Sequence, residues 1–191
     1  ASYGLALLRE RKRTALKALF DLSKLTQVDA INEKSVVFRI VPKLNAPGRM
    51  GDPTLSLDLL LAQSYDDAFA IARKLKDVNT QRQELQEKIY KEALQQASLS
   101  LDYRWGVVVS SAGWHQGIVG IVAAKLAEHF KRPAVVVGLE GDRGRGSVRS
   151  YGNINIFEAL EASKDHLLTF GGHPGAAGLE ISISEIGNFA R

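Results

Sequence analysis

The spacing of apolar and polar residues predicts a helical first half of the chain. Within residues 4–25 the apolar positions recur at helical intervals: Leu5, Leu8, Ala15, Leu16, Leu19 and Phe20. Basic side chains lie between them, and they form either a solvated helix face or a surface for nucleic acid or another anionic partner. A short helix is expected at 33–41. The segment 42–53 holds three of the five prolines, so we expect an irregular loop there.

A long polar helix is predicted next, and it marks a domain boundary. Asp52 and Pro53 are typical of a helix start, which gives a short helix from 54 to about 62. Ser64 begins a second capping pattern. One narrow apolar seam then runs to about Ala97, through Ile71, Leu75, Val78, Leu85 and Ile89, with Arg82 at the position that the seam skips. A helix of about 30 residues with so little apolar surface usually connects two bodies.

After Leu101 the pattern changes to short buried runs typical of strands, which alternate with helices. The expected strands are 105–110, 133–138, 145–149 and 179–183, and the expected helices are 117–130 and 156–170. We therefore predict an α/β protein that ends in a small mixed-sheet domain. The expected divisions are residues 1–53, the connector helices 54–101 and the α/β domain 102–191.

Composition limits the class of protein. Hydrophobic residues make up 45% of the 191 residues and charged residues 24%, which is enough for a packed core. The absence of cysteine excludes a disulfide scaffold, a thiolate nucleophile and a cysteine-based zinc site, and it fits a reducing cytoplasm. No apolar run reaches the roughly 18 residues of a membrane helix, so no membrane contact is expected. The formal net charge of +4 permits an anionic partner.

Three glycine-bearing segments in the second half are candidates for ligand binding. The first, residues 111–120, joins an expected strand to an expected helix, and free N–H groups at that helix N-terminus would suit an anion. Trp114 and His115 could stack on a base or contact a phosphate. Alternatively, Trp114 packs the loop against the core and His115 caps the helix.

The second segment, residues 144–150, places Arg145, Ser147 and Arg149 on one face of an expected strand. Two guanidinium groups beside a hydroxyl can cradle a phosphate, because arginine donates bidentate, charge-assisted hydrogen bonds. The alternative is a solvent-facing edge strand with incidental charges. The third segment, residues 170–178, holds four glycines around His173, which requires very tight packing or the close approach of a ligand.

The motifs that cleave phosphates are missing from the sequence. It contains no Walker A motif, no complete Gly-x-Gly-x-x-Gly before a helix and no Gly-x-Ser-x-Gly elbow. No cluster of histidine and carboxylate residues has metal-ligand spacing, so no metal site is expected within this chain. The residues by themselves predict a site that binds a phosphate without cleaving it.

Residues 171–178 (Gly-Gly-His-Pro-Gly-Ala-Ala-Gly) resemble the Gly-Gly-His-x-x-Ala-Ala-Gly signature of the DHH-associated domain. Three further segments, in the same order along the chain, resemble motifs of the RecJ family: residues 44–52, 113–120 and 145–150. That family comprises single-strand-DNA-specific 5′-to-3′ exonucleases of the DHH phosphoesterase superfamily. Pro47 departs slightly from the family's usual Asn-Ala-Ala-Gly-Arg.

The resemblance implies which part of an enzyme this chain is. The chain starts at Ala1 and stops soon after a helix start at Ser184, so we expect a part of a longer protein. Residues 1–53 are similar to the helical end of the catalytic domain, and residues 102–191 to the DHH-associated domain. In the intact enzyme the ligands of manganese or magnesium would lie upstream and an OB-fold downstream. This chain alone should then be inactive.

Partners and site residues are also implied by the resemblance. The partners would be single-stranded DNA and, in the intact enzyme, a single-strand-binding protein and a helicase acting in DNA repair and recombination. The implied substrate- and phosphate-binding residues are Arg49, Arg145, Ser147, Arg149, Gly171, Gly172 and His173. Of these, Arg49, Ser147 and Arg149 would bind the 5′ phosphate or the nearby backbone. Trp114 and His115 would face the DNA.

Two other classes of function stay open. One is a fragment of a superfamily relative that acts on oligoribonucleotides or adenosine bisphosphate, although a shorter connector is expected there than residues 54–97 provide. The other is a nucleic-acid-binding module without catalytic function. Metal-ligand motifs upstream of Ala1 would favour the exonuclease over the module.

Overall fold

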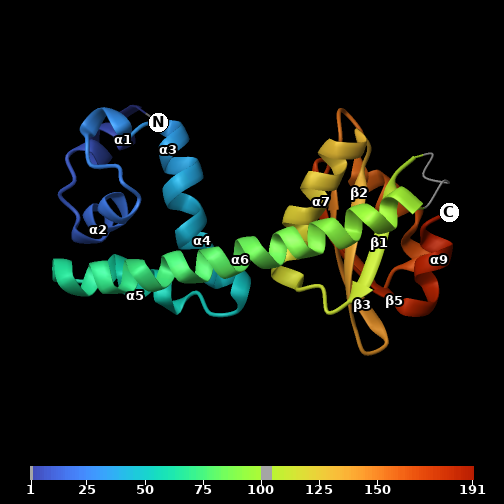
Figure 1. Ribbon diagram of the computed structural model, residues 1–191. Coiled ribbons are helices and arrows are strands. Elements are labelled where there is room, and N and C mark those ends of the chain that lie inside the picture. The colour runs from blue at the N-terminus through green and yellow to red at the C-terminus, as the bar shows by residue number, and fades with distance from the viewer. Residues whose placement is uncertain (1, 100–104) are drawn as a thin grey trace. The chain divides into compact units, whose positions relative to one another are not determined.

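The protein folds into two compact units, which a computed structural model describes for residues 2–99 and 105–191 (Figure 1). The first unit is Ala1–Gln83 and the second is Glu84–Arg191. The long helix α6 (Tyr65–Leu99) contributes residues to both. The first unit is helical, and the second contains a five-stranded mixed sheet, which confirms the predicted α/β class.

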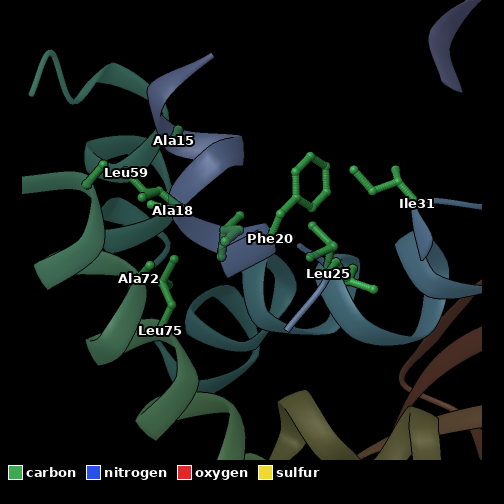
Figure 2. Close-up of a cluster of buried hydrophobic side chains, with 11 residues drawn as sticks. Ala15, Ala18, Phe20, Leu25, Ile31, Leu59, Ala72 and Leu75 are labelled. Atoms are coloured by element: carbon green, nitrogen blue, oxygen red, sulfur yellow. The ribbon is translucent and has the colours of Figure 1, made fainter. Parts of the chain in front are cut away.

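The first unit is held together by a core of aliphatic and aromatic side chains. Before α6 its elements are α1 (Ser2–Arg9), α2 (Thr14–Leu22), η1 (Val28–Ala30), α3 (Glu33–Ser35), η2 (Val36–Ile40), α4 (Val41–Met50) and α5 (Thr54–Leu61). Figure 2 shows Phe20, Leu25 and Ile31 in this core, together with Leu59 and Leu75. Each of these five is at most 1% exposed. Burying one such side chain stabilises the fold by roughly 1.5–3 kcal/mol.

The expectation of an irregular loop at 42–53 is wrong, because most of this segment is the helix α4. Pro42 lies in the first turn of α4, directly after the π-helix η2. Pro47 lies inside the helix and is buried, so packing offsets the hydrogen bond that it cannot donate. The helix ends at Gly51, whose φ of +120° suits glycine alone. The Asp52 N–H then bonds the Pro47 carbonyl at 3.1 Å.

The predicted starts of α5 and α6 are confirmed. The Asp52 carboxylate accepts a hydrogen bond from the Thr54 N–H at 2.9 Å, and the Ser64 hydroxyl accepts one from the Asp67 N–H at 3.1 Å. The buried line along α6 keeps Leu75 and Ile89 of the expected seam, but four of its eight residues are alanines: Ala68, Ala72, Leu75, Asn79, Arg82, Ile89, Ala93 and Ala97. Alanines let a helix approach its neighbours closely without large apolar side chains.

The second unit is built on a sheet with the strand order β1-β2-β3-β5-β4. The strands are β1 (Val107–Ala112), β2 (Ala134–Glu140), β3 (Arg143–Arg149), β4 (Thr169–His173) and β5 (Ala176–Ser182). Strands β1 and β2 are parallel, and the pairs β2–β3, β3–β5 and β5–β4 are antiparallel. Helix α7 (Gln116–Phe130) connects β1 to β2 and packs on the sheet at β2 and β3 (Figure 1). The remaining elements are α8 (Ile156–Ala162), η3 (Lys164–His166), η4 (Ile183–Glu185) and α9 (Ile186–Phe189).

Helices cover both faces of this sheet. Ile156 and Leu160 of α8 pack with Val137, Val148 and Ile181 in a second core. On the outer edge of the sheet, β1 is covered by a side chain of α6. The Gln96 amide donates to the Ser110 carbonyl at 3.2 Å and accepts from the Ser110 N–H at 3.0 Å. This amide takes the place of a neighbouring strand at that position.

One prediction for the second half needs correction. The helix expected at 156–170 ends at Ala162, and a strand, β4, begins at Thr169. The glycine-rich segment 170–178 is therefore a β-hairpin, in which β4 and β5 pair from Thr169↔Glu180 to His173↔Ala176. Glycine is depleted in strands, so composition alone argued against this strand.

Candidate functional site

Strand register gathers the candidate residues of the second unit into three parallel rows. Alternate residues of a strand face the same side, and the partners across β3, β5 and β4 are directly opposite one another. The rows are Arg145–Glu180–Thr169, Ser147–Gly178–Gly171 and Arg149–Ala176–His173. All three lie on the face of the sheet that carries α7. Arg145, Ser147 and Arg149 thus share one face, as strand alternation predicted.

Ser147 and Arg149 converge on one point of α7. A Cβ atom added to Gly120 would lie 2.9 Å from the Ser147 hydroxyl oxygen and 3.1 Å from Nη2 of Arg149. The other terminal nitrogen of Arg149, Nη1, donates to the Val148 carbonyl at 2.8 Å. A hydroxyl and an anchored guanidinium therefore stand side by side, and a phosphate could accept hydrogen bonds from both. Gly120 makes this convergence sterically possible.

An open cavity of about 590 Å³ adjoins this pair on the same face of the sheet. Its lining includes Gln116 and Val119 of α7, Ser147 of β3 and Gly171 of β4. Arg145 and Glu180 form its charged wall, with 2.7 Å between Nε and Oε1. The Arg145 side chain is 64% exposed. Arg145 is thus neutralised by a carboxylate, and Ser147 and Arg149 follow it along the same face of β3.

Trp114 and His115 support the fold of the second unit. Trp114 is 5% exposed, and its indole Nε1 donates to the Glu92 carboxylate at 2.8 Å. The His115 Nδ1 accepts a hydrogen bond from the Gly117 N–H at 3.1 Å and caps α7. The loop lies close to β2, because a Cβ on Gly138 would come within 2.4 Å of the Trp114 carbonyl oxygen. These contacts match packing and capping, the alternative to a DNA-facing role.

The hairpin glycines have different roles. A Cβ at Gly172 would lie 2.5 Å from both the Ala176 carbonyl oxygen and the Ala177 Cα, so only glycine fits there. At Gly171 an added Cβ meets nothing within 4 Å, which leaves the backbone open to the cavity. His173 is exposed at the end of β4. The hairpin turn is tied down by the Ser150 N–H, which donates to the Gly175 carbonyl at 3.1 Å.

Arg49 belongs to the first unit, at the last turn of α4. Its neighbour Arg82 is buried on α6 and donates to the Asn79 side chain at 2.8 Å. Burial, together with the positive charge of Arg49, lowers the pKa of Arg82. Ser147 and Arg149 belong to the second unit, so a shared site with Arg49 stays a prediction.

The described residues do not fit a metal centre. Among residues 2–99 and 105–191, no three histidine, cysteine, aspartate or glutamate side chains come together in a group that could hold an ion. Within the same residues, no helix has both the length and the apolar character that crossing a bilayer requires. The Ser147 hydroxyl and the Arg149 guanidinium offer hydrogen bonds and positive charge to an anion.

Sequence reasoning missed three residues that shape the site. Gly120 and Gly178 lie in the candidate segments 111–120 and 170–178 but were given no role of their own, and Glu180 lies outside every candidate segment. Gly120 ends the motif at residues 113–120, but its closeness to Ser147 depends on how α7 packs on β3. Glu180 carried a weak signal, because it alternates with apolar residues along β5 and so faces the same side as Gly178.

Comparison with known proteins identifies the domain and its relatives. Residues 105–191 match the DHHA1 domain. The single-stranded-DNA-specific exonuclease RecJ of Bacillus subtilis (strain 168) is 37% identical over 188 residues, which is 97% of this chain and 24% of that protein. The RecJ of Escherichia coli (strain K12) is 32% identical over 188 residues, covering 93% of this chain and 32% of that protein.

Solved RecJ structures share the fold. The crystal structure of Thermus thermophilus RecJ in complex with Mg²⁺ matches with a TM-score of 0.84 and 31% identity, covering 97% of this chain and 28% of that chain. The structure of the same enzyme in complex with Mn²⁺ matches with a TM-score of 0.85 and 32% identity, covering 97% of this chain and 27% of that chain. This chain spans about a quarter to a third of these relatives. The resemblance inferred from four motifs is confirmed: the chain is homologous over nearly its whole length to the RecJ single-stranded-DNA-specific exonucleases, and residues 105–191 form a DHHA1 domain.

Proposed function

We propose that this chain is the strand-end-binding part of a 5′-to-3′ exonuclease for single-stranded DNA that acts in cytoplasmic DNA repair and recombination. Homology to RecJ exonucleases over 97% of the chain supports this proposal. The structural observation that carries it is the convergence of the Ser147 hydroxyl and the Arg149 guanidinium beside Gly120, next to an open cavity. Hydrolysis is not assigned to this chain, which we expect to bind DNA without cleaving it.

Ser147 and Arg149 would distinguish the 5′ end of a DNA strand from its interior by the charge of the phosphate. A terminal phosphate monoester carries about −1.5 to −2 charges at pH 7, compared with −1 for an internal phosphodiester. A guanidinium therefore attracts the terminal group more strongly, and its planar fork fits two phosphate oxygens. The bond from Arg149 Nη1 to the Val148 carbonyl holds the guanidinium in place, so less conformational freedom is lost on binding.

Other candidate residues have supporting roles in the proposal. Arg49 would contact the same strand from the first unit, and Arg145 would add positive charge beside Ser147. His173 would line the cleft together with Gly171 and Gly172. In the intact enzyme, Mg²⁺ or Mn²⁺ would be held outside the described residues, and a single-strand-binding protein and a helicase would be the partners.

The test is binding of the purified chain to one oligonucleotide, either 5′-phosphorylated or 5′-hydroxylated, at several salt concentrations. The phosphorylated strand should bind more tightly. Arg149→Gln should reduce that preference by roughly 10- to 150-fold, since one hydrogen bond to a charged group contributes about 1.5–3 kcal/mol. For this variant, the slope of the logarithm of affinity against the logarithm of salt concentration should flatten by about one unit.

Arg143→Gln is a matched control, because it removes the same charge from the same strand at a side chain that is 66% exposed. This variant should keep the preference for the phosphorylated end. Incubation of the chain and the strand with Mn²⁺ should leave the strand uncut. Equal affinity of the unaltered chain for the two strands would overturn the proposal.

A further inference from the structure

Two polar residues lie in the buried row of α6, within the first unit. Asn79 is 7% exposed and Arg82 is 8% exposed, whereas the other buried residues of this row are alanine, leucine and isoleucine. The two are three positions apart and share one face of the helix, where Nη2 of Arg82 donates to the Asn79 side-chain oxygen at 2.8 Å. Arginine is rarely buried to this degree, so this pair requires an explanation.

Packing alone does not explain the pair. The apolar seam of α6 skips position 82, where a leucine or a methionine would bury apolar surface without removing a charge from water. Replacing buried charged groups by well-packed apolar side chains is often neutral or stabilising. A buried arginine that the fold could replace in this way is more readily explained by a ligand that needs its charge.

A second guanidinium acts on Arg82. Arg49 lies in the last turn of α4, is exposed and belongs to the same unit. Burial first, and then the positive charge of Arg49, lowers the pKa of Arg82. Two like charges at close range raise each other's free energy, and an anion that contacts both lowers it. Burial has also removed part of the water around Arg82, so less water is lost when an anion binds.

The two guanidinium groups suit a phosphodiester. A guanidinium is planar and binds two phosphate oxygens at once, and each internal linkage of DNA presents two such oxygens with one negative charge. The bond to Asn79 fixes the plane of the Arg82 guanidinium, which reduces the conformational freedom that is lost on binding. A strand whose 5′ end is bound by Ser147 and Arg149 continues as a row of such linkages.

We infer that Arg82, oriented by Asn79, joins Arg49 as a clamp that binds one internal phosphodiester of the DNA strand. The inference rests on the proposed function, which supplies the strand. Arg82 and Arg49 touch the substrate, and Asn79 is a positioning residue. Because the phosphodiester is the same at every nucleotide, the clamp adds affinity irrespective of the base sequence and of the group at the 5′ end.

Arg82→Gln tests the clamp in the full chain, with affinity measured by fluorescence anisotropy. The variant keeps a side chain that can bond Asn79 but loses the charge. Affinity for the 5′-phosphorylated and the 5′-hydroxyl strand should fall by the same factor, roughly 10- to 150-fold, as expected for one hydrogen bond to a charged group. The preference for the phosphorylated end should remain. Arg73→Gln is the matched control, because it removes the same charge from an exposed position on the same helix, and it should leave both affinities nearly unchanged.

A neutral linkage locates the contact and separates binding from folding. In a set of strands, one internal phosphodiester at a time is replaced by an uncharged methylphosphonate. One such replacement should weaken binding to the unaltered chain about as much as Arg82→Gln does, and the Arg82→Gln chain should not respond to it. The Arg73→Gln chain should respond as the unaltered chain does. Asn79→Ala should weaken binding and leave the dependence of affinity on salt unchanged, because the charge of Arg82 stays and its orientation is lost.

The two proposals fail in different ways. If the Arg82→Gln chain binds both strands as the unaltered chain does, or responds to every neutral linkage as the unaltered chain does, the clamp is wrong, even where the preference for 5′ phosphate remains. If that preference is absent from the unaltered chain, the proposed function is wrong, and the response to neutral linkages still decides whether the clamp exists.

Discussion

Replacing Gly120 by alanine should separate phosphate recognition from stability. The new Cβ would lie 2.9 Å from the Ser147 oxygen, 3.1 Å from Nη2 of Arg149 and 3.5 Å from the Ser147 Cβ. The first two distances are shorter than ordinary van der Waals contact, so the hydroxyl and the guanidinium must shift by a few tenths of an ångström. The backbone of α7 gains from the change, because alanine is favoured over glycine within a helix by about 1 kcal/mol.

The expected loss is in affinity. If the displaced groups no longer both reach the phosphate, one hydrogen bond to a charged group is lost, which costs about 1.5–3 kcal/mol, or roughly 10- to 150-fold in affinity for the phosphorylated strand. Binding of the 5′-hydroxyl strand should change little. The melting temperature should stay the same or rise. Affinity is measured by fluorescence anisotropy and stability by thermal unfolding, on the same preparations.

Gly187→Ala is the matched control, since a Cβ on this helical glycine meets nothing within 4 Å and the residue lies on α9, away from the site. It should leave the affinity for both strands unchanged. A Gly120→Ala chain that retains the full preference for the phosphorylated end would refute the role assigned to this glycine. Weaker binding accompanied by a lower melting temperature would also refute it, because the effect would then be on folding.

Three other substitutions test the fold around the site. Gly172→Val places a Cβ 2.5 Å from the hairpin backbone and should destabilise the chain by at least 2 kcal/mol, at about the upper end of ordinary substitutions, in urea denaturation. Trp114→Phe removes the donor that bonds Glu92 and should cost about 1–3 kcal/mol in the same assay, while phosphate preference persists. Hydrogen bonding to His166 lowers the pKa of Glu185, so this contact stabilises the fold above the ordinary glutamate pKa of about 4.3 and is lost as pH falls through the lower folded value. Glu185→Gln should therefore melt below the unaltered chain at neutral pH, and the difference between the two melting temperatures should shrink as the pH is lowered. A difference that stays constant with pH would contradict this.

Strand alternation and helix-capping patterns predicted the structure correctly where the local sequence determines it. Strand alternation placed Ser147 and Arg149 on one face, and the capping pattern at Ser64 correctly located the start of α6. The same rules failed at Pro47, where burial in the first unit maintains a helix that proline content argues against. They also failed at β4, where Gly172 permits a close cross-strand approach to β5.

The chemistry of the site was predictable only in part for the same reason. Arginine and serine side chains indicate a phosphate cradle by residue type. The space that this cradle occupies depends on Gly120, and the neutralisation of Arg145 depends on Glu180, which lies 35 positions further along the chain. Trp114 shows the converse, because a residue type typical of base stacking is buried and hydrogen-bonded to Glu92.

The Gln96 amide bears on the solubility of this protein. An uncovered edge strand offers a row of N–H and C=O groups to any other extended chain, and this is a common start of aggregation. At Ser110 both groups of the β1 edge are already bonded to one side chain. A second molecule could add a strand there only by displacing this amide. Edge-to-edge association through β1 is thereby discouraged without a proline or a charged residue in the strand.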